Sequence, residues 1–259
     1  MRSLAGENVL VIGGGGFIGS HVVDELCKED VEQIVIYDNF CRGSKENLKH
    51  ALNDPRVKIY DVGGDILQSD ILNSAVKESD SVIHLAALWL LQCHEYPKAA
   101  FDVNIHGTFN VLESVRLHCP KALVAYSSTN KVYGGMEDVK ITNNGNCYEY
   151  ESLPEGVDET RPLDFHSPYG CSKGAADQYI VDYARIYDMN TVSFRQSCIY
   201  GTRQFGVEDQ GWVAWFTIAS HFKKAITRMP LGVSSNFRYW GDDKTIYIKR
   251  GKGARLWDI

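Results

Sequence analysis

The stretch Gly13-Gly14-Gly15-Gly16-Phe17-Ile18-Gly19 stands where a short apolar run, Asn8–Ile12, gives way to a helical pattern. Its glycines match G-x-x-G-x-x-G at positions 13, 16 and 19, or G-x-G-x-x-G at positions 14, 16 and 19. Glycines at such a turn let backbone N–H groups approach a pyrophosphate, and the helix N-terminus adds a positive potential. A plain glycine-rich turn has the same letters, so the stretch alone is weak evidence for a nucleotide site.

A carboxylate at the end of the next apolar run strengthens the nucleotide interpretation. Asp38 follows Gln33–Tyr37 and stands 19 residues after Gly19, close to the spacing of the acid that binds an adenosine ribose. A carboxylate at this place repels a 2′-phosphate. We therefore expect the cofactor to be NAD, and Arg42 nearby leaves NADP as the alternative.

Short β-rich runs alternate with helical patterns through the first two-thirds of the chain. This alternation predicts an α/β fold built on a Rossmann-type, doubly wound parallel sheet. The polar run from Met136 to Phe165 has no periodicity and is expected to be a long surface loop. The expected strands are Asn8–Ile12, Gln33–Tyr37, Val57–Tyr60, Ser81–Leu85, Ala122–Tyr126 and Thr191–Phe194, and the expected helices are Phe17–Lys28, Ser44–Leu52, Ser69–Lys77, Lys98–His118 and Tyr169–Tyr187.

Composition excludes several classes of protein. The 259 residues include 33 acidic and 27 basic ones, and the net charge of −6 argues against a nucleic acid or an anionic membrane as the main partner. Met1–Asn8 lacks the apolar stretch of a secretory signal, and the longest apolar run, Val82–Cys93, is too short to span a bilayer. Seven scattered cysteines without a C-x-x-C pair are typical of reduced thiols. We expect a cytoplasmic protein with no structural metal that works on a small molecule.

Two further turns fall at the predicted carboxyl edge of the sheet, where a dinucleotide binds. Gly64-Asp65-Ile66 follows the third predicted strand, and His84-Leu85-Ala86-Ala87 follows the fourth. Asp65 would face the adenine, and the small Ala86-Ala87 would let the chain pass close to the dinucleotide. His84 is more typical of a packed strand residue than of a catalyst.

Tyr169 and Lys173 are four residues apart in a predicted helix, so they lie on one face. Ser167 and Pro168 fit an N-cap and a first helical position, which places Tyr169 in the first turn. A lysine about 4 Å from a phenolate, at an effective dielectric constant of about 20, lowers the pKa of the tyrosine by about three, toward neutrality. Such a pair is more often a solvated helix face, but the hydroxyl run Ser127-Ser128-Thr129 offers a place for a substrate oxygen.

Taken together, these motifs resemble the extended short-chain dehydrogenase/reductase family of nucleotide-sugar epimerases and dehydratases. The resemblance covers about residues 8–220 and is carried by the glycines at 13, 16 and 19, by Asp38, by the stretch YSSTNKVYG at 126–134, and by Tyr169-x-x-x-Lys173. Within the family, residues 163–179, 129–131, 201–205 and 209–212 look most like the branch of CDP-paratose (CDP-tyvelose) 2-epimerases, whereas residues 87–91 look like a broader set of NAD-dependent sugar epimerases. The resemblance implies a NAD-binding Rossmann domain over 1–200 and a partial sugar-nucleotide-binding region over 201–259.

The resemblance also implies roles for single residues. Thr129 matches the hydroxyl that orients the substrate, Tyr169 the acid/base, and Lys173 the residue that binds the nicotinamide ribose. Asp38 and Asn39 match the adenosine-ribose contacts, Asp65 and Ile66 match the adenine contacts, and Asn104 matches an asparagine near the active site. The full set of implied NAD contacts is Gly13, Gly16, Phe17, Ile18, Gly19, Asp38, Asn39, Asp65, Ile66, Leu85, Ala86, Ala87, Asn104, Ser127, Tyr169 and Lys173.

These matches imply an epimerase with tightly held NAD that oxidises a nucleotide sugar to a keto sugar and reduces it again on the opposite face. A CDP-linked sugar inverted at carbon 2 is the leading substrate, and a UDP-sugar 4-epimerase with the same chemistry stays open. The dehydratase branch usually has Asp-Glu after its threonine, and Asn130 and Lys131 stand there instead. A catalytically silent NAD-binding protein is the alternative from another class.

The family also implies a homodimer through Lys98–His118 and Tyr169–Tyr187, with the small residues Gly170, Gly174, Ala175 and Ala176 allowing close approach. The segment Gly251–Ile259 departs from the family's G-x-G-x-x-x-R-D pattern, because Trp257 stands where an arginine usually contacts the nucleotide phosphates. We expect NAD binding to be complete by about residue 220 and the sugar nucleotide to be held weakly.

Overall fold

The computed structural model describes residues 3–143, 145, 147–207, 210–226, 248–252 and 255–258. The chain divides into two compact units, residues 1–197 and residues 198–259. No helix among the described residues is long and apolar enough to cross a membrane.

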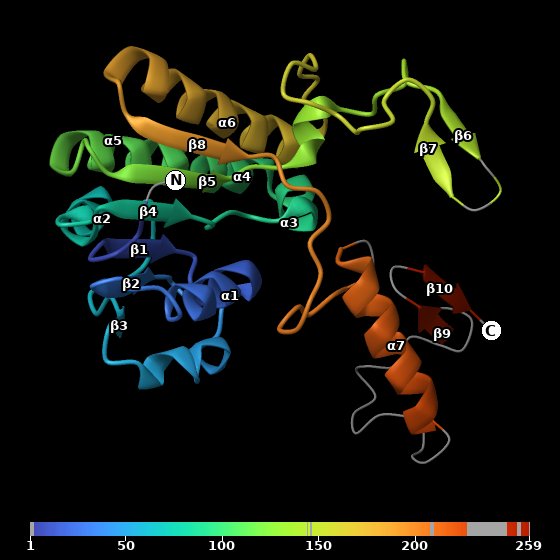
Figure 1. Ribbon diagram of the computed structural model, residues 1–259, viewed down its shortest axis with the longest axis horizontal. Coiled ribbons are helices and arrows are strands. Elements are labelled where there is room, and N and C mark those ends of the chain that lie inside the picture. Colours follow the sequence, from blue (N-terminus) through green and yellow to red (C-terminus); the bar gives the residue numbers. More distant parts are fainter. Residues whose placement is uncertain are drawn as a thin grey trace. The chain divides into compact units, whose positions relative to one another are not determined.

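The first unit is built on a six-stranded parallel sheet (Figure 1). Its strands are β1 Asn8–Ile12, β2 Gln33–Tyr37, β3 Val57–Ile59, β4 Ser81–His84, β5 Leu123–Ser127 and β8 Asn190–Phe194. Their order across the sheet is β3-β2-β1-β4-β5-β8, which is the doubly wound Rossmann order. The predicted fold class is therefore confirmed.

Both faces of the sheet are covered, which explains why its central strands are apolar without alternation. In β1, Val9 and Val11 pack into one hydrophobic cluster, whereas Leu10 and Ile12 pack into the other. The first cluster includes Val23 of α1 Phe17–Leu26. The second is formed with α2 Ser69–Val76, α5 Thr108–His118 and α6 Ser167–Tyr187.

The helix predicted over Lys98–His118 contains a break in its hydrogen-bond pattern. It consists of α4 Pro97–Ala100, a π-helical segment Phe101–Gly107, and α5. A short helix, α3 Leu90–Glu95, precedes it within a run that the sequence analysis read only as apolar. π-helical turns inside helices are frequent at functional sites, and Asn104 lies in this one.

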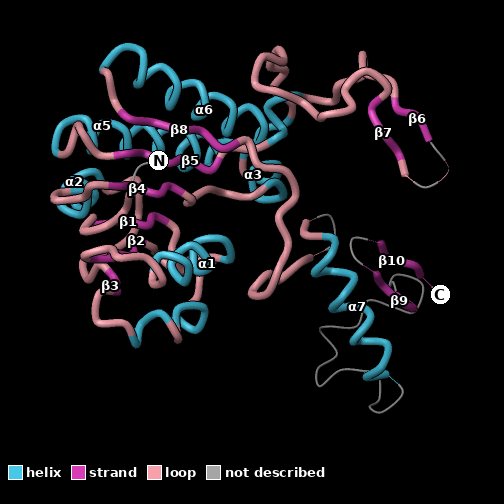
Figure 2. Tube along the Cα trace, in the orientation of Figure 1, coloured by secondary structure: helices cyan, strands magenta, loops and turns pink. Residues whose placement is uncertain are grey.

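Two predicted elements differ from the structure. The helix expected over Ser44–Leu52 is replaced by two 3₁₀ turns, Lys45–Leu48 and Ala51–Asn53. Leu48 ends the first turn and Ala51 begins the second, and both side chains are buried in the core. The run from Met136 to Phe165, expected to be only loop, contains the antiparallel hairpin of β6 Ile141–Asn143 and β7 Tyr148–Tyr150 (Figure 2).

The capping prediction for α6 is one residue off. His166 is the N-cap and makes no side-chain cap hydrogen bond, and Ser167 is the first residue of the helix. Ser167 has a left-handed φ of 65°, and its Oγ accepts a hydrogen bond from the N–H of Gly170 at 3.2 Å within the first turn. The interpretation of the small residues of α6 as a dimer surface is wrong for three of the four. Gly170, Gly174 and Ala176 are buried inside the protomer, and a Cβ on Gly174 would lie 2.4 Å from the ring of Phe165.

The described part of the second unit contains α7 Trp212–Ile226 and an antiparallel pair, β9 Ile248–Lys252 and β10 Arg255–Asp258. Trp257 pairs with Arg250 in the backbone register of this hairpin. Gly253 and Ala254 of the predicted phosphate-binding segment lie outside the described residues.

Candidate functional site

The glycine turn between β1 and α1 is fixed by close backbone contacts. Gly13 has a φ of 85°, and a Cβ added to it would lie 2.8 Å from the backbone nitrogen of Ala86. A Cβ on Gly19 would lie 2.1 Å from the carbonyl oxygen of Gly13. These two positions therefore require glycine for the turn itself.

Gly16 is different, because its neighbourhood is open. A Cβ there would meet only the carbonyl oxygen of Gly13, at 3.3 Å, and no other heavy atom beyond its chain neighbours within 4 Å. Gly16 is the N-cap of α1 and supplies no side-chain cap, so the N–H groups of the first turn are left for another acceptor. An open backbone surface at a helix N-terminus fits a pyrophosphate group.

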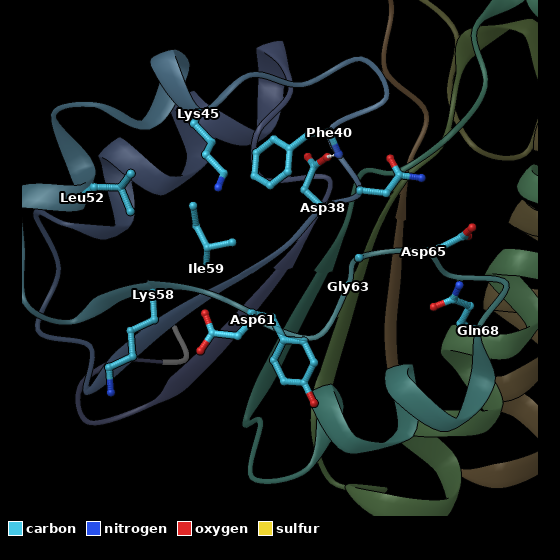
Figure 3. Close-up of a pocket in the computed structure, with 13 residues that line it drawn as sticks. Asp38, Phe40, Lys45, Leu52, Lys58, Ile59, Asp61, Gly63, Asp65 and Gln68 are labelled. Carbon is cyan, nitrogen blue, oxygen red and sulfur yellow. Dashed lines mark hydrogen bonds between the residues drawn. The ribbon is translucent and has the colours of Figure 1, made fainter.

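A cavity of about 870 Å³ opens at the carboxyl ends of β2 and β3 (Figure 3). Asp38, Asn39 and Asp65, three of the predicted nucleotide contacts, line it together with Phe40 and Lys45. The volume suits a small-molecule ligand, and the lining mixes carboxylate, amide and aromatic groups. Ile66, the neighbouring predicted contact, has its side chain in the core, where it packs against Gly107.

Asp38 is held by the backbone of two loops. Its Oδ2 accepts a hydrogen bond from the N–H of Gly15 at 2.8 Å, and its Oδ1 accepts one from Phe40 at 2.7 Å. Burial raises the pKa of this carboxyl, and the two backbone hydrogen bonds oppose the rise. Phe40 has a left-handed φ of 54°, and its ring lies so close to Gly15 that a Cβ there would be 2.6 Å from Cε1. Phe40 could not be predicted as part of the site, because nothing in the sequence signals its backbone conformation.

A second pair missed by the sequence analysis joins the loops after β2 and β4. The guanidinium of Arg42 lies over the ring of Trp89, 4.1 Å from its centroid. The Trp89 indole Nε1 is buried, with no hydrogen-bond partner among the described residues. The arginine and the indole N–H therefore lie together on the loops that flank Ala86 and Ala87.

The predicted catalytic residues meet at the carboxyl edge of β5. Thr129 is buried and caps a 3₁₀ turn, Asn130–Tyr133, by accepting a hydrogen bond from the N–H of Lys131 at 3.2 Å. Lys173 is buried, and its Nζ donates to the Ser127 carbonyl oxygen at 2.6 Å and lies 4.1 Å from the centroid of the Tyr126 ring. Tyr169 stands one turn earlier on the same helix and interacts with the Thr129 hydroxyl.

The expected lowering of the Tyr169 pKa by Lys173 is wrong for this structure. Burial raises the pKa of Tyr169, and only the interaction with Thr129 acts in the opposite direction. Lys173 directs its ammonium to the Ser127 carbonyl, and burial lowers its own pKa to about 7. The charge of the lysine favours a low pKa of the tyrosine, but desolvation of both buried groups acts against it and is larger.

Asn104 connects the π-helical segment to the helix that carries Tyr169 and Lys173. Its Oδ1 accepts a hydrogen bond from the N–H of Leu88 at 2.7 Å, and its Nδ2 donates to the Oγ of Ser172 at 3.0 Å. Ser172 donates in turn to the carbonyl oxygen of Tyr169 at 3.0 Å. The amide therefore fixes the first turns of α6, and its predicted place near Tyr169 agrees with this geometry.

His84 is a packed strand residue, as the sequence analysis expected. It is fully buried, and its Nε2 lies 3.0 Å from Oγ1 of Thr108. The Thr108 hydroxyl donates its hydrogen to the Asn104 carbonyl oxygen at 2.8 Å, so the neutral His84 carries its proton on Nε2 and donates to Thr108. Burial lowers the pKa of His84 to about 3.

The described residues contain no group of three or more His, Cys, Asp or Glu side chains placed to hold a metal ion. The arrangement offers an anion-binding turn, a nucleotide-sized cavity, and a tyrosine, lysine and threonine at one edge of the sheet. Such a set can bind a dinucleotide and move a proton to or from a hydroxyl held beside it.

Comparison with known proteins gives a consistent result. Residues 9–244 match the model of the NAD dependent epimerase/dehydratase family. The chain is 41% identical over 233 residues to CDP-paratose 2-epimerase of Salmonella typhi, covering 88% of this chain and 68% of that protein. It is 34% identical over 210 residues to a putative UDP-glucose 4-epimerase of Methanocaldococcus jannaschii, covering 80% of this chain and 61% of the relative.

Among solved structures, the UDP-glucose 4-epimerase of Thermus thermophilus in complex with NAD superposes with a TM-score of 0.67 at 31% identity. The match covers 84% of this chain and 63% of that one. The chain thus spans about two thirds of the length of these relatives.

Proposed function

Because the chain belongs to the NAD-dependent epimerase/dehydratase family, we propose that it binds NAD and epimerises a nucleotide sugar, with a CDP-linked sugar inverted at carbon 2 as the leading substrate. The observation that carries the proposal is the convergence of Thr129, Tyr169 and Lys173 at the sheet edge that also holds the open glycine turn. The 41% identity to a CDP-paratose 2-epimerase supports the choice of sugar nucleotide.

In the proposed cofactor site, Gly16 and the first turn of α1 hold the pyrophosphate, and Asp38 and Asn39 receive the adenosine ribose in the cavity that Asp65 also lines. Lys173, with Ser127 beside it, holds the nicotinamide ribose. When bound, NAD supplies the acceptor and then the donor of a hydride at the sugar carbon. Asp38 disfavours a 2′-phosphate by charge repulsion.

The residues of this chain handle the proton. Thr129 orients the sugar hydroxyl by hydrogen bonding, and Tyr169 accepts the proton as the carbon is oxidised to a ketone. Lys173 directs its ammonium to the Ser127 carbonyl oxygen beside the proposed ribose site, and because burial lowers its pKa to about 7, the positive charge at this place is lost above about that pH. After the keto sugar turns, Tyr169 returns the proton and the opposite epimer forms without net redox change.

A UDP-sugar 4-epimerase is the second candidate, and a specific observation favours it: relatives of that activity also align with most of the chain. The test incubates the protein with NAD and with CDP-paratose or UDP-glucose in separate reactions and identifies the products by NMR. Inversion at carbon 2 of the CDP-sugar supports the leading proposal, and inversion at carbon 4 of UDP-glucose supports the second. NAD binding with neither product identifies a silent NAD-binding protein.

Tyr169→Phe is the control for the chemistry. The ring and its packing remain, and the proton acceptor is lost, so turnover should fall about 10²–10⁴-fold while NAD affinity stays within about twofold. Retention of most of the turnover by this variant would assign the proton transfer to another residue.

We also propose a cytoplasmic homodimer. The seven cysteines form no disulfide, which supports a reducing compartment. On α5 and α6, which lie side by side (Figure 1), Phe109, Tyr179 and Tyr187 expose part of their rings, and Ile186 is 65% exposed. Such an apolar surface on two helices suits a second copy of the chain. Light scattering tests this, and a single species of 29.1 kDa would contradict it.

A further inference from the structure

A buried ion pair lies one helical turn beyond Lys173. Asp177 is fully buried, and its Oδ1 accepts a hydrogen bond from Nη2 of Arg195 at 2.9 Å. Its Oδ2 accepts hydrogen bonds from Oγ of Ser193 at 2.6 Å and from Nε of Arg195 at 3.2 Å. Ser193 lies in β8 and Arg195 directly follows it, so this carboxylate joins α6 to the edge strand.

Arg195 also reaches the loop that carries Thr129. Its Nη1 donates to the phenol oxygen of Tyr133 at 3.0 Å, and its guanidinium lies 5.2 Å from the centroid of that ring. Tyr133 ends the 3₁₀ turn that Thr129 caps. The backbone of the loop is bound to the same edge, because Asn130 donates its N–H to the Gln196 carbonyl oxygen at 2.8 Å.

We propose that Asp177 and Arg195 are positioning residues for the catalytic group. The pair fixes the loop of Thr129 against the helix of Tyr169 and Lys173, and Asp177 supplies a negative charge one turn from the Lys173 ammonium. This proposal rests on the proposed function for its catalytic meaning, but its electrostatic part can be measured without a substrate.

The charged and titratable groups around Lys173 come from four elements. Cys93 of α3 and His84 of β4 face it, the ring of Tyr126 in β5 lies beneath it, and Asp177 follows it on α6. Burial keeps His84 neutral, and Cys93, whose own pKa is raised by burial, raises the pKa of Lys173 less than Asp177 does. Asp177 raises the pKa of Lys173 against the larger lowering by desolvation.

Stabilisation of the fold does not by itself explain a buried ion pair such as Asp177 and Arg195. Removing two charges from water offsets most of their attraction, and an apolar pair of similar volume often stabilises a core as well. An apolar pair could not change the pKa of Lys173, whereas Asp177 places a negative charge near it. An apolar pair could also not bind the Tyr133 hydroxyl, whereas Arg195 does and so holds the loop of Thr129.

The decisive measurement is the titration of Lys173 by NMR in protein labelled with ¹³C at lysine Cε, with the resonance assigned by its loss in Lys173→Met. In Asp177→Asn the pKa of Lys173 should fall by about 0.5 or more, because a nearby opposite charge is gone. The matched control is Asp182→Asn, which removes the same charge from an exposed position of the same helix and should leave the titration unchanged. Arg195→Gln removes the positive member of the pair, so the pKa of Lys173 should rise or stay the same.

A merely structural role predicts a different pattern, in which Asp177→Asn and Arg195→Gln either both lower the pKa of Lys173 or both leave it unchanged. Either result would overturn the proposal. If Asp177→Asn does not fold, Arg195→Gln decides alone: a rise of the Lys173 pKa supports the proposal, and a fall or an unchanged value overturns it.

If the parent protein turns over a sugar nucleotide, Asp177→Asn should lower kcat at least about tenfold and change KM by no more than about threefold. The alkaline limb of the pH profile of kcat should also move to lower pH in this variant. If the parent protein turns over no sugar nucleotide, the proposed function fails while the titration still decides the positioning role. If turnover occurs and the titration does not move, the positioning role fails alone.

Discussion

The glycine turn allows a sharp test, because two of its glycines are required for different reasons. In Gly19→Ala the new Cβ would lie 2.1 Å from the Gly13 carbonyl oxygen and 2.7 Å from Cα of Gly14, far inside ordinary contact distance. Both neighbours are backbone atoms, so the turn itself must move. Overpacking of this kind costs about 3 kcal/mol, and a unit of this size loses about 2–4 °C in Tm per kcal/mol. We therefore expect Tm to fall by about 6–12 °C.

Gly16→Ala is the matched variant. Its Cβ meets one atom at 3.3 Å, and the φ of −75° and ψ of −179° at Gly16 suit alanine. Replacing a glycine N-cap by alanine costs about 1 kcal/mol, so Tm should fall by about 2–4 °C. The methyl group would fill the space left for the pyrophosphate, and NAD affinity should fall at least about tenfold.

Circular dichroism gives Tm and isothermal titration calorimetry gives the NAD affinity of both variants and the parent. The reasoning fails if Gly16→Ala binds NAD as tightly as the parent, because the open space would then not be the dinucleotide site. It fails equally if Gly19→Ala melts within about 2 °C of the parent, because the turn would then accommodate a side chain.

Three other variants test separate parts of the structure. The parent should bind NAD at least about tenfold better than NADP, and Asp38→Ala should narrow that gap in calorimetry; equal affinities in the parent would contradict the role of the carboxylate. Thr129→Val should reduce turnover less than Tyr169→Phe in the same NMR assay, since it orients the hydroxyl without taking its proton, and a larger loss would reverse the two roles. Because burial lowers the pKa of His84 from 6.5 to about 3, the unfolded chain binds a proton in this pH window that the folded protein does not. As the pH is lowered from about 6.5 to about 3, the free energy of unfolding should therefore fall by about 1.4 kcal/mol per pH unit. Urea denaturation at several pH values should show a smaller dependence of the free energy of unfolding on pH in His84→Gln than in the parent.

The parallel sheet could be predicted closely, because its strands are short apolar runs with polar boundaries. β1 and β2 have the predicted ends, β3, β4 and β8 differ from the prediction by one residue at one end, and β5 is shifted by one residue at both ends. The hairpin of β6 and β7 could not be predicted in this way. All six of its residues are exposed, so no alternation of apolar and polar side chains marks it.

The catalytic group was predictable in its members but not in its contacts. The four-residue spacing of Tyr169 and Lys173 predicts that they share one face of a helix, and in the structure both lie on the same face of α6. The hydrogen bond from Lys173 to the Ser127 carbonyl depends on how deeply α6 packs against β5, which is a tertiary property. Asp177 carried a usable signal, since it repeats the four-residue spacing after Lys173, but its partner Arg195 follows a strand and is found only in the folded protein.

The π-helical segment has a consequence for how this part of the chain can change length. An α-helix turns by about 100° per residue, and a π-helical turn holds one residue more than an α-helical turn. Deleting a single residue from Phe101–Gly107 would therefore restore regular winding with α4 kept close to its present direction relative to α5, but it would rewind the segment that carries Asn104. Asn104 would then lose both Leu88 and Ser172. Exposed positions of a helix usually accept substitutions, but here the number of residues in the helix is itself part of the site, because it determines where the Asn104 amide lies.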